Sequence, residues 1–418
     1  MTPRAVSNDA VLASLAPGSR IYVPGSTGEP RAVLDALARD PERLPGLDVV
    51  TTAVPGINRF GPDDVAPSAT VTGLFMQPGF RAAQAEGRFR HLPLPFSGFV
   101  DHLAATAPFD ACLVQVAPPD AAGRCSLGAA VEFTPLALAR SRRRVAVLNP
   151  AMPAIPGAAS VTLDDFDLVT EADTPLPTYE PGPGSREAAT IAAFVATLVE
   201  DGAALQAGLG KVPEALFGLL HDRRALRLHS GMLSDGALAL AEAGALDPDF
   251  DHASCVWVGS AALYRALHGR TGFTVAGCEV THDLRHLAGI DGFVAVNSAL
   301  AVDLFGQANL EHAQGRAVSG VGGAADFALG ARLSRGGISV VALPAAFGRE
   351  PRSRIVPRLE DGIASLPRHA VDVVVTEHGL ADLRGRSVHE RAEALISIAA
   401  PAFRADLLTA WHAIRDRL

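Results

Sequence analysis

Short β-rich apolar runs alternate with segments of helical period along this chain, and the alternation is the strongest constraint on its fold. The apolar runs cover residues 21–23, 47–50, 111–116, 145–148, 292–296, 338–343 and 371–375. Strands that are apolar on both faces are typical of a parallel sheet covered by helices. The pattern therefore predicts an α/β protein built on open, mostly parallel sheets.

The length of the chain indicates more than one domain. A single hydrophobic core stops growing at about 250–300 residues, and the chain has 418. Residues 174–184 are too rich in Pro and Gly for a helix or a strand, and Ser185 is a suitable N-cap for a helix beyond them. We expect two similar α/β domains, over 1–185 and 186–418, with the active site in the cleft between them.

Charge excludes one class of partner. The formal net charge is −9, whereas a nucleic-acid-binding protein needs a basic face. The one basic run, at residues 140–144, precedes an apolar strand. It fits either the end of a helix, where cations complement the dipole, or a phosphate site, and the helix end is the simpler interpretation.

Targeting and metal signals are weak. The start of the chain lacks the apolar region of a signal peptide, and no run approaches ~18 apolar residues, so we expect a cytoplasmic protein without a membrane partner. The four cysteines are Cys112, Cys125, Cys255 and Cys278. They form no Cys-x-x-Cys pair, so reduced thiols and no metal cofactor are expected.

Two glycine-rich elements are candidate ligand loops. Gly208, Gly210 and Lys211 lie in a strand-to-helix turn, where backbone N–H groups can face an anion or a developing oxyanion. A tight turn without any ligand is the alternative there. Residues 318–327 carry Gly320, Gly322 and Gly323, and such a concentration of glycine favours a mobile ligand loop over a simple turn.

Several ordered motifs then resemble those of one protein family. They are residues 118–128 (PPDAAGRCSLG), 149–153 (NPAMP), 227–236 (RLHSGMLSDG), 296–307 (VNSALAVDLFGQ), 353–357 (SRIVP) and 376–385 (TEHGLADLRG). Together they resemble the acetyl-CoA hydrolase/transferase family, which includes the 4-hydroxybutyrate and butyrate:acetate CoA-transferases. The resemblance runs from about Pro24 to Pro401 and implies coenzyme A, bound as an acyl-CoA thioester, as substrate.

The resemblance also implies roles for single residues. Gly320, Val321, Gly322 and Gly323 match the family's mobile loop beside the acyl pocket, and residues 208–211 match its oxyanion donor. Asn297 and Glu377 match groups that orient the catalytic group and the thioester carbonyl. From residue type alone, a capping or salt-bridged carboxylate is the alternative for Glu377. In the first half, Gly25 and Phe60 are expected to line the facing wall.

The family pattern breaks at its nucleophile. Where the family reads roughly His-Thr-Glu-Met-Phe-Ser-Asp-Gly, with Glu as the covalent nucleophile, this chain has Gly231. Ala324 and Phe305 also depart from the usual Gln and Thr. A glycine has no carboxylate, so this alignment excludes transfer through an enzyme-bound glutamyl-CoA.

Other residues near Gly231 are candidate substitutes for the missing nucleophile. His229 and Ser230 are adjacent, and neighbours on an extended strand point to opposite faces, so they form a poor catalytic pair. Cys278 or Glu279 could reach the site. His282 and His286, four residues apart, would bind a metal if helical, although solvated histidines are the more common outcome.

The sequence thus indicates an enzyme that acts on a small or medium acyl-CoA, by CoA transfer to a carboxylate acceptor or by hydrolysis. The alternative is a non-catalytic acyl-CoA-binding scaffold or regulatory subunit. Retention of Asn297, Glu377 and both glycine loops favours the enzyme, because polar groups are costly to bury without a use. A homodimer is the expected assembly for an α/β enzyme of this size.

Overall fold

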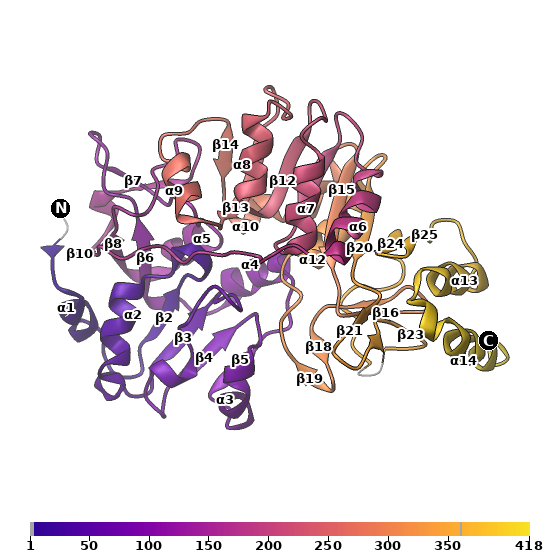
Figure 1. The fold of residues 1–418 in the computed structure, drawn as a ribbon. Coiled ribbons are helices and arrows are strands. Elements are labelled where there is room, and N and C mark those ends of the chain that lie inside the picture. Colours follow the sequence, from indigo (N-terminus) through magenta and orange to yellow (C-terminus); the bar gives the residue numbers. More distant parts are fainter. Residues whose placement is uncertain (1–3, 360–361) are drawn as a thin grey trace. The chain divides into compact units, whose positions relative to one another are not determined.

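The computed structural model describes residues 4–359 and 362–418, and the chain folds into two compact units. The first unit comprises Met1–Glu180 and Asp251–Thr281, and the second comprises Pro181–Phe250 and His282–Leu418. Each contains a sheet and helices (Figure 1), which confirms the predicted two-domain α/β class. Among the described residues, no helix is both long enough and apolar enough to span a membrane.

The division of the chain differs from the single boundary expected after residue 185. The first crossing, between Glu180 and Pro181, falls inside the Pro- and Gly-rich stretch, but Asp251–Thr281 returns to the first unit. Isolated bridges explain the return, because Val256 pairs with Ala130 and Val275 pairs with Ala158. Hydrophobic periodicity reports which elements form and not which strands pair, so the sequence pattern does not reveal this segment's partner.

The first unit is built on a sheet of strand order β1-β10-β8-β6-β2-β3-β4-β5, in which every neighbouring pair is parallel. The strands are β1 (Arg4–Ala5), β2 (Arg20–Val23), β3 (Asp48–Thr51), β4 (Thr70–Gly73), β5 (Phe89–His91), β6 (Phe109–Val116), β8 (Ser141–Leu148) and β10 (Leu168–Glu171). The helices are α1 (Asn8–Ala13), α2 (Arg31–Ala38), α3 (Arg81–Ala85), α4 (Phe96–Ala105) and α5 (Thr134–Ala139). The predicted apolar runs of this half are its inner strands.

Shorter ladders complete the first unit. They are formed by β7 (Arg124–Ser126) with β9 (Ser160–Thr162), which are antiparallel, and by β13 (His252–Trp257) with β14 (Phe273–Val275), which are parallel. Helices α9 (Ala261–Leu267) and α10 (Cys278–Thr281) belong to the returning segment.

The basic run at residues 140–144 lies mainly in a strand and not at a helix end. Helix α5 ends at Ala139 with Arg140 as its C-cap, and β8 begins at Ser141. Arg142 pairs with Asp110 at 3.1 Å, and Arg144 donates to the carbonyl of Leu138. Because the strand follows the helix without a loop, only Arg140 lies at the helix end that the sequence predicted, and the other arginines of the run lie in the strand.

The second unit has the strand order β12-β11-β15-β20-β24-β25. The strands are β11 (Ala204–Ala207), β12 (Arg227–Leu233), β15 (Phe293–Ser298), β20 (Ile338–Ala342), β24 (Val373–Thr376) and β25 (Gly379–Asp382). Only β25 is antiparallel among the pairs β11–β12, β11–β15, β15–β20, β20–β24 and β24–β25. The helices are α6 (Arg186–Ala196), α7 (Lys211–Leu219), α8 (Asp235–Glu242), α11 (Leu284–Ala288), α12 (Ala324–Leu333), α13 (Val388–Ile398) and α14 (Arg404–Arg415).

Small ladders follow the main strands of the second unit. They are β16 (Ala301–Asp303) with β17 (Ala308–Asn309) and β23 (Ile355–Val356), β18 (His312–Ala313) with β19 (Arg316–Ala317), and β21 (Ala346–Phe347) with β22 (Arg352–Ser353).

Apolar faces of the helices hold the second unit together. Phe293 of β15 and Phe327 of α12 are buried in one core cluster with Leu287 of α11. The start of α6 confirms the expected cap, because Ser185 Oγ accepts a hydrogen bond from the N–H of Ala188 at 3.1 Å. Helix α12 therefore lies against the strands whose ends carry the candidate site.

Candidate active site

The order of the strands in the second unit creates a topological switch point between β11 and β15. From β11 the chain adds β12 on one side, and it later adds β15, β20 and β24 on the other. Ligands of open α/β sheets bind at the carboxyl ends of the strands beside such a point. Ala207 pairs with Val296, so Gly208 and Asn297, the next residues on the two strands, are level with each other at this edge.

Asn297 is held in place by a residue that the sequence analysis did not single out. Its Nδ2 donates to Oε1 of Gln206 at 3.3 Å, and both side chains are buried. Among the described residues this amide makes no further hydrogen bond, so its second N–H and its carbonyl oxygen are available to a ligand. A polar Gln206 within the apolar strand Ala204–Ala207 was the sequence signal for this pair.

The Gly208–Gly210 turn leads directly into α7. Gly210, the N-cap, has φ of +128°, a conformation that favours glycine. A Cβ on Gly208 would meet nothing within 4 Å, so the backbone of the turn is open to an approaching group. Lys211 begins the helix and is exposed.

Gly231 lies on the other side of β11. Leu205 pairs with Leu228 in parallel, and continuing this register brings Gly231 level with Gly208. Ser230 Oγ donates to the carbonyl of Ala207 at 3.0 Å. Strand alternation places Ser230 on the opposite face from His229 and Gly231, and His229 stacks near His286, with ring centroids 4.9 Å apart.

The space beside Gly231 is occupied by the imidazole of His282. A Cβ on Gly231 would lie 3.1 Å from Nε2 of His282 and 3.3 Å from Phe327. A Cβ on Gly323 would lie 2.5 Å from the same Nε2. The φ of Gly231 is not in the left-handed region, so space rather than backbone conformation restricts this position.

His282 is a neutral, enclosed side chain. It is fully buried, and its ring centroid is 4.7 Å from that of Phe327. Burial, and then the nearby His229, lower its pKa to about 3. His282 precedes α11 and exposed His286 lies within it, so the two do not form the helical metal-binding pair considered from the sequence.

The second glycine loop, residues 320–323, also lies beside the imidazole of His282. Its start is anchored where the N–H groups of Val318 and Ser319 donate to the carbonyl of Glu311 at 2.8 and 3.3 Å. Gly322 has φ of +55°, and Gly323 is the N-cap of α12. Gly231 and Gly323, predicted separately, are thus brought to one side chain, His282, which the sequence analysis considered only as a metal ligand.

Glu377 lies at the same edge but farther along the sheet. Its Oε2 accepts a hydrogen bond from the N–H of Ala345 at 2.8 Å, and its Oε1 is 3.7 Å from Nε2 of His378. Glu377 lies two strand spacings, about 10 Å, from Asn297 across the sheet, and the register places it three residues, about 10 Å, farther along the strands. Four strand spacings, about 19 Å, separate its strand from that of Gly231. Glu377 therefore holds the loop after β20 and does not lie beside Gly231.

The two substitutes proposed from the first unit's segment differ in burial. Cys278 is fully buried, and burial, with Cys255 next in effect, raises the pKa of its thiol well above its usual value. A protonated thiol is a poor nucleophile. Glu279 is exposed.

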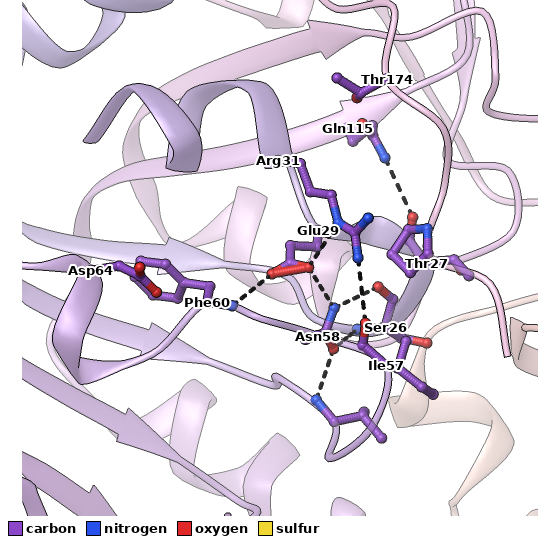
Figure 2. A network of polar contacts seen from close by, with 12 residues as sticks. Ser26, Thr27, Glu29, Arg31, Ile57, Asn58, Phe60, Asp64, Gln115 and Thr174 are labelled. Atoms are coloured by element: carbon purple, nitrogen blue, oxygen red, sulfur yellow. Dashed lines mark hydrogen bonds and ion pairs between the residues drawn. The ribbon is translucent and has the colours of Figure 1, made fainter. Parts of the chain in front are cut away.

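The first unit has its own switch point, between β2 and β6, and its loop is firmly held. Figure 2 shows the polar network around Asn58, whose Oδ1 accepts from the N–H groups of Ser26 and Val54 at 2.7 and 2.8 Å. Its Nδ2 donates to Ser26 O and to Glu29 Oε2, both at 2.9 Å. The network keeps Ser26 at φ of +49°, a strained value for a residue with a side chain.

Gly25 and Phe60, expected to line a wall, are packed inside this region. A Cβ on Gly25 would overlap the carbonyl of Thr52, and Phe60 is 4% exposed.

A second titratable group escaped the sequence analysis. Glu132 is buried with φ of +42°, and its Oε2 accepts from Thr52 Oγ1 at 2.9 Å. Burial raises its pKa to about 7, against the lowering effect of the Thr52 hydrogen bond.

Comparison with known proteins covers both units. Residues 4–177 match the acetyl-CoA hydrolase/transferase N-terminal domain, and residues 259–411 match the C-terminal domain. The chain is 32% identical over 398 residues to the 4-hydroxybutyrate coenzyme A transferase of Clostridium kluyveri, with 93% of each chain covered.

Two solved structures share the whole fold. RipA from Yersinia pestis superposes with a TM-score of 0.92 at 28% identity, over 99% of this chain and 98% of that one. A 4-hydroxybutyrate CoA-transferase from Porphyromonas gingivalis gives 0.81 at 28% identity, also over 99% and 98%. With the domain matches on both sides, the chain belongs to the acetyl-CoA hydrolase/transferase family.

Proposed function

We propose that this chain acts on a small or medium acyl-CoA and cleaves or transfers the thioester by direct attack, without a glutamyl-CoA intermediate. The observation that carries the proposal is the contact geometry at Gly231. No carboxylate stands there, and the imidazole of His282 fills the space in which one would begin. The relatives' names, which include CoA transferases and acetyl-CoA hydrolases, support the substrate class.

In this proposal the attacking group is water or the carboxylate of the acceptor. Attack on the thioester carbonyl forms a tetrahedral intermediate, whose collapse expels CoA as a thiolate that takes up a proton. Water as the nucleophile gives the free acid, whereas an acceptor carboxylate gives a mixed anhydride that CoA then attacks at its other carbonyl. In this route the N–H groups of the Gly208–Gly210 turn and the Asn297 amide polarise the carbonyl, which their position at one edge of the sheet supports.

We assign Glu377 to orient the attacking group. The strands of Asn297 and Glu377 are about 10 Å apart, and Glu377 lies three residues, about 10 Å, farther along, which leaves room for a thioester and an attacking group between the two side chains. The hydrogen bond from the N–H of Ala345 fixes the position of Oε2.

A cavity of about 260 Å³ supports an acceptor or CoA subsite in the same unit. Its lining includes Arg352 and Arg354. Arg354 donates to the carbonyl of Ala299, just after β15, at 3.1 Å. Burial lowers the pKa of Arg354, against the smaller raising effect of Glu377. A fixed guanidinium of this kind suits a carboxylate or phosphate oxygen.

The non-catalytic alternative has one specific observation in its favour. His282 is neutral and packed against Phe327 where the family's nucleophile would be, which is also what a binding protein that lost its reaction would show.

Thiol-reactive detection of free CoA separates these outcomes. A panel of acyl-CoAs, each with and without acetate, should show release of CoA or formation of acetyl-CoA, with sequential rather than ping-pong kinetics and no inactivation by borohydride. Ping-pong kinetics with a borohydride-sensitive intermediate would contradict the direct route. Measurable acyl-CoA affinity without turnover of any panel member would favour the binding protein.

A further inference from the structure

Five arginines converge on a cavity of about 470 Å³ in the second unit. They are Arg332, Arg368, Arg384, Arg386 and Arg391. The chain as a whole has a net charge of −9, and the lining contains a single carboxylate, Asp372. The cavity therefore concentrates positive charge in an otherwise acidic protein.

The cavity lies at the opposite edge of the sheet from the candidate active site. Asp372 directly precedes β24, whereas Glu377 directly follows it. Antiparallel pairing places Asp382, at the end of β25, beside Val373, at the start of β24. Helix α12 carries Gly323 at its start and Arg332 in its last turn, and its ten residues span about 15 Å. This separation makes the cavity a distinct site.

Carboxylates neutralise only part of this charge. Arg332 pairs with Asp372, and Arg384 pairs with Asp382. Among the residues that the structure describes, no carboxylate forms an ion pair with the other three arginines, Arg368, Arg386 and Arg391.

Arg391 is fixed in position by neutral acceptors. Its guanidinium donates to the carbonyls of Phe305 and Leu383, both at 3.2 Å, and of Arg368 at 2.7 Å. Burial, followed by the nearby Arg368 and Arg332, lowers its pKa. The cations repel one another in the absence of an anion, and a bound anion would relieve this repulsion.

We propose that this cavity binds a small anion that carries two phosphate groups. Ligand sites typically have volumes of about 300–1,000 Å³, and guanidinium forks match phosphate oxygens. Each phosphate group carries about −1.5 to −2 at pH 7, so two of them balance the three arginines without carboxylate partners. Because backbone carbonyls already order Arg391, binding costs less side-chain entropy there.

Calorimetric titration of the full chain with inorganic pyrophosphate tests the proposal. Arg368 and Arg386 are exposed, so Arg368→Gln/Arg386→Gln should fold normally. It should bind pyrophosphate at least tenfold more weakly than wild type, with the difference shrinking as salt rises. The matched control is Arg186→Gln, at the exposed start of α6, which should bind as wild type does.

The probes also define the ligand class. Pyrophosphate should bind more tightly than inorganic phosphate or citrate, and an equal or better response to citrate would overturn the phosphate assignment. Absence of pyrophosphate binding, or equal binding by the double variant, would overturn the site itself. Titration with acetyl-CoA should give the same affinity in wild type and double variant. If acetyl-CoA binding were lost instead, the arginines would belong to the acyl-CoA site and the distinct site would be refuted.

Discussion

The Nε2 atom of His282 lies 3.1 Å from the point where a Cβ on Gly231 would stand. A side chain at position 231 would therefore be in close contact with the imidazole of His282, which already lies beside this position. In the proposed alignment, Gly231 stands where the family has its catalytic Glu. Restoring that Glu requires His282 to move or to be replaced.

The enclosed imidazole of His282 should make the protein less stable in acid. Its folded pKa of about 3 lies below the unfolded value of about 6.5. Between these values the unfolded state binds more protons, so stability present above pH ~6.5 is lost as pH falls, by at most about 1.4 kcal/mol per pH unit. Urea unfolding at pH 7 and pH 5 should show a larger loss for wild type than for His282→Gln. Equal losses would mean that the imidazole is accessible to protons in the folded state.

The contribution of Glu132 to the free energy of unfolding should change with pH in the opposite direction to that of His282. Burial raises its folded pKa to about 7, above the unfolded value of about 4.3. The folded state binds more protons between these values, so the contribution of Glu132 is full below pH ~4.3 and is lost as pH rises through 7. Glu132→Gln should therefore gain stability relative to wild type between pH 5 and pH 8. A constant difference across that range would contradict the burial of a titrating carboxyl.

Two glycines of the site should respond differently to alanine. A Cβ on Gly208 meets nothing within 4 Å, whereas a Cβ on Gly323 falls 2.5 Å from His282 Nε2. Gly323→Ala should lower the free energy of unfolding by about 1–3 kcal/mol through overpacking, while Gly208→Ala should leave it nearly unchanged. If the Gly208 turn faces the ligand, Gly208→Ala should instead weaken acyl-CoA binding in a direct titration. Unchanged acyl-CoA affinity of the Gly208→Ala variant would show that the turn does not face the ligand.

The role of Glu377 in the reaction can be tested with a substitution that keeps its hydrogen bond from the N–H of Ala345. Glu377→Gln retains an oxygen for the N–H of Ala345, so the loop after β20 should remain in place. Loss of the charged carboxylate should lower acyl-CoA turnover by about 10²–10⁴, with CoA affinity nearly intact. Turnover equal to that of wild type would mean that Glu377 has no role in the reaction and only holds the loop after β20.

Much of the fold was predictable because buried parallel strands leave a continuous apolar signature. Runs such as 111–116 and 338–343 became β6 and β20, and the Ser185 cap was visible from residue type alone. The return of Asp251–Thr281 to the first unit was not predictable, because it depends on bridges between residues more than a hundred positions apart, such as Ala130 and Val256.

The candidate site, like the fold, was predictable from the sequence only in part. Motif resemblance selected Gly231, Asn297 and the glycine loops, and the strand order brings their backbones to one edge of a sheet. The sequence did not predict that His282 packs beside Gly231, since the contact depends on where the segment before α11 packs. It also did not show that two strand spacings separate Glu377 from Asn297.

The most direct test of the account is the intact mass of variants after exposure to acyl-CoA. Glu placed at position 231 alone must displace His282 and Phe327, so Gly231→Glu should be destabilised by about 1–3 kcal/mol and should form little adduct. Gly231→Glu/His282→Gly opens the space and should accumulate a borohydride-sensitive glutamyl-CoA thioester, with CoA transfer to acetate by ping-pong kinetics. Wild type and His282→Gly, the matched control, should form none.

Two results would contradict the account. An adduct on wild type would show that another residue supplies a covalent nucleophile. Absence of any adduct on a folded Gly231→Glu/His282→Gly protein that still binds acyl-CoA would show that position 231 is not where the thioester reacts.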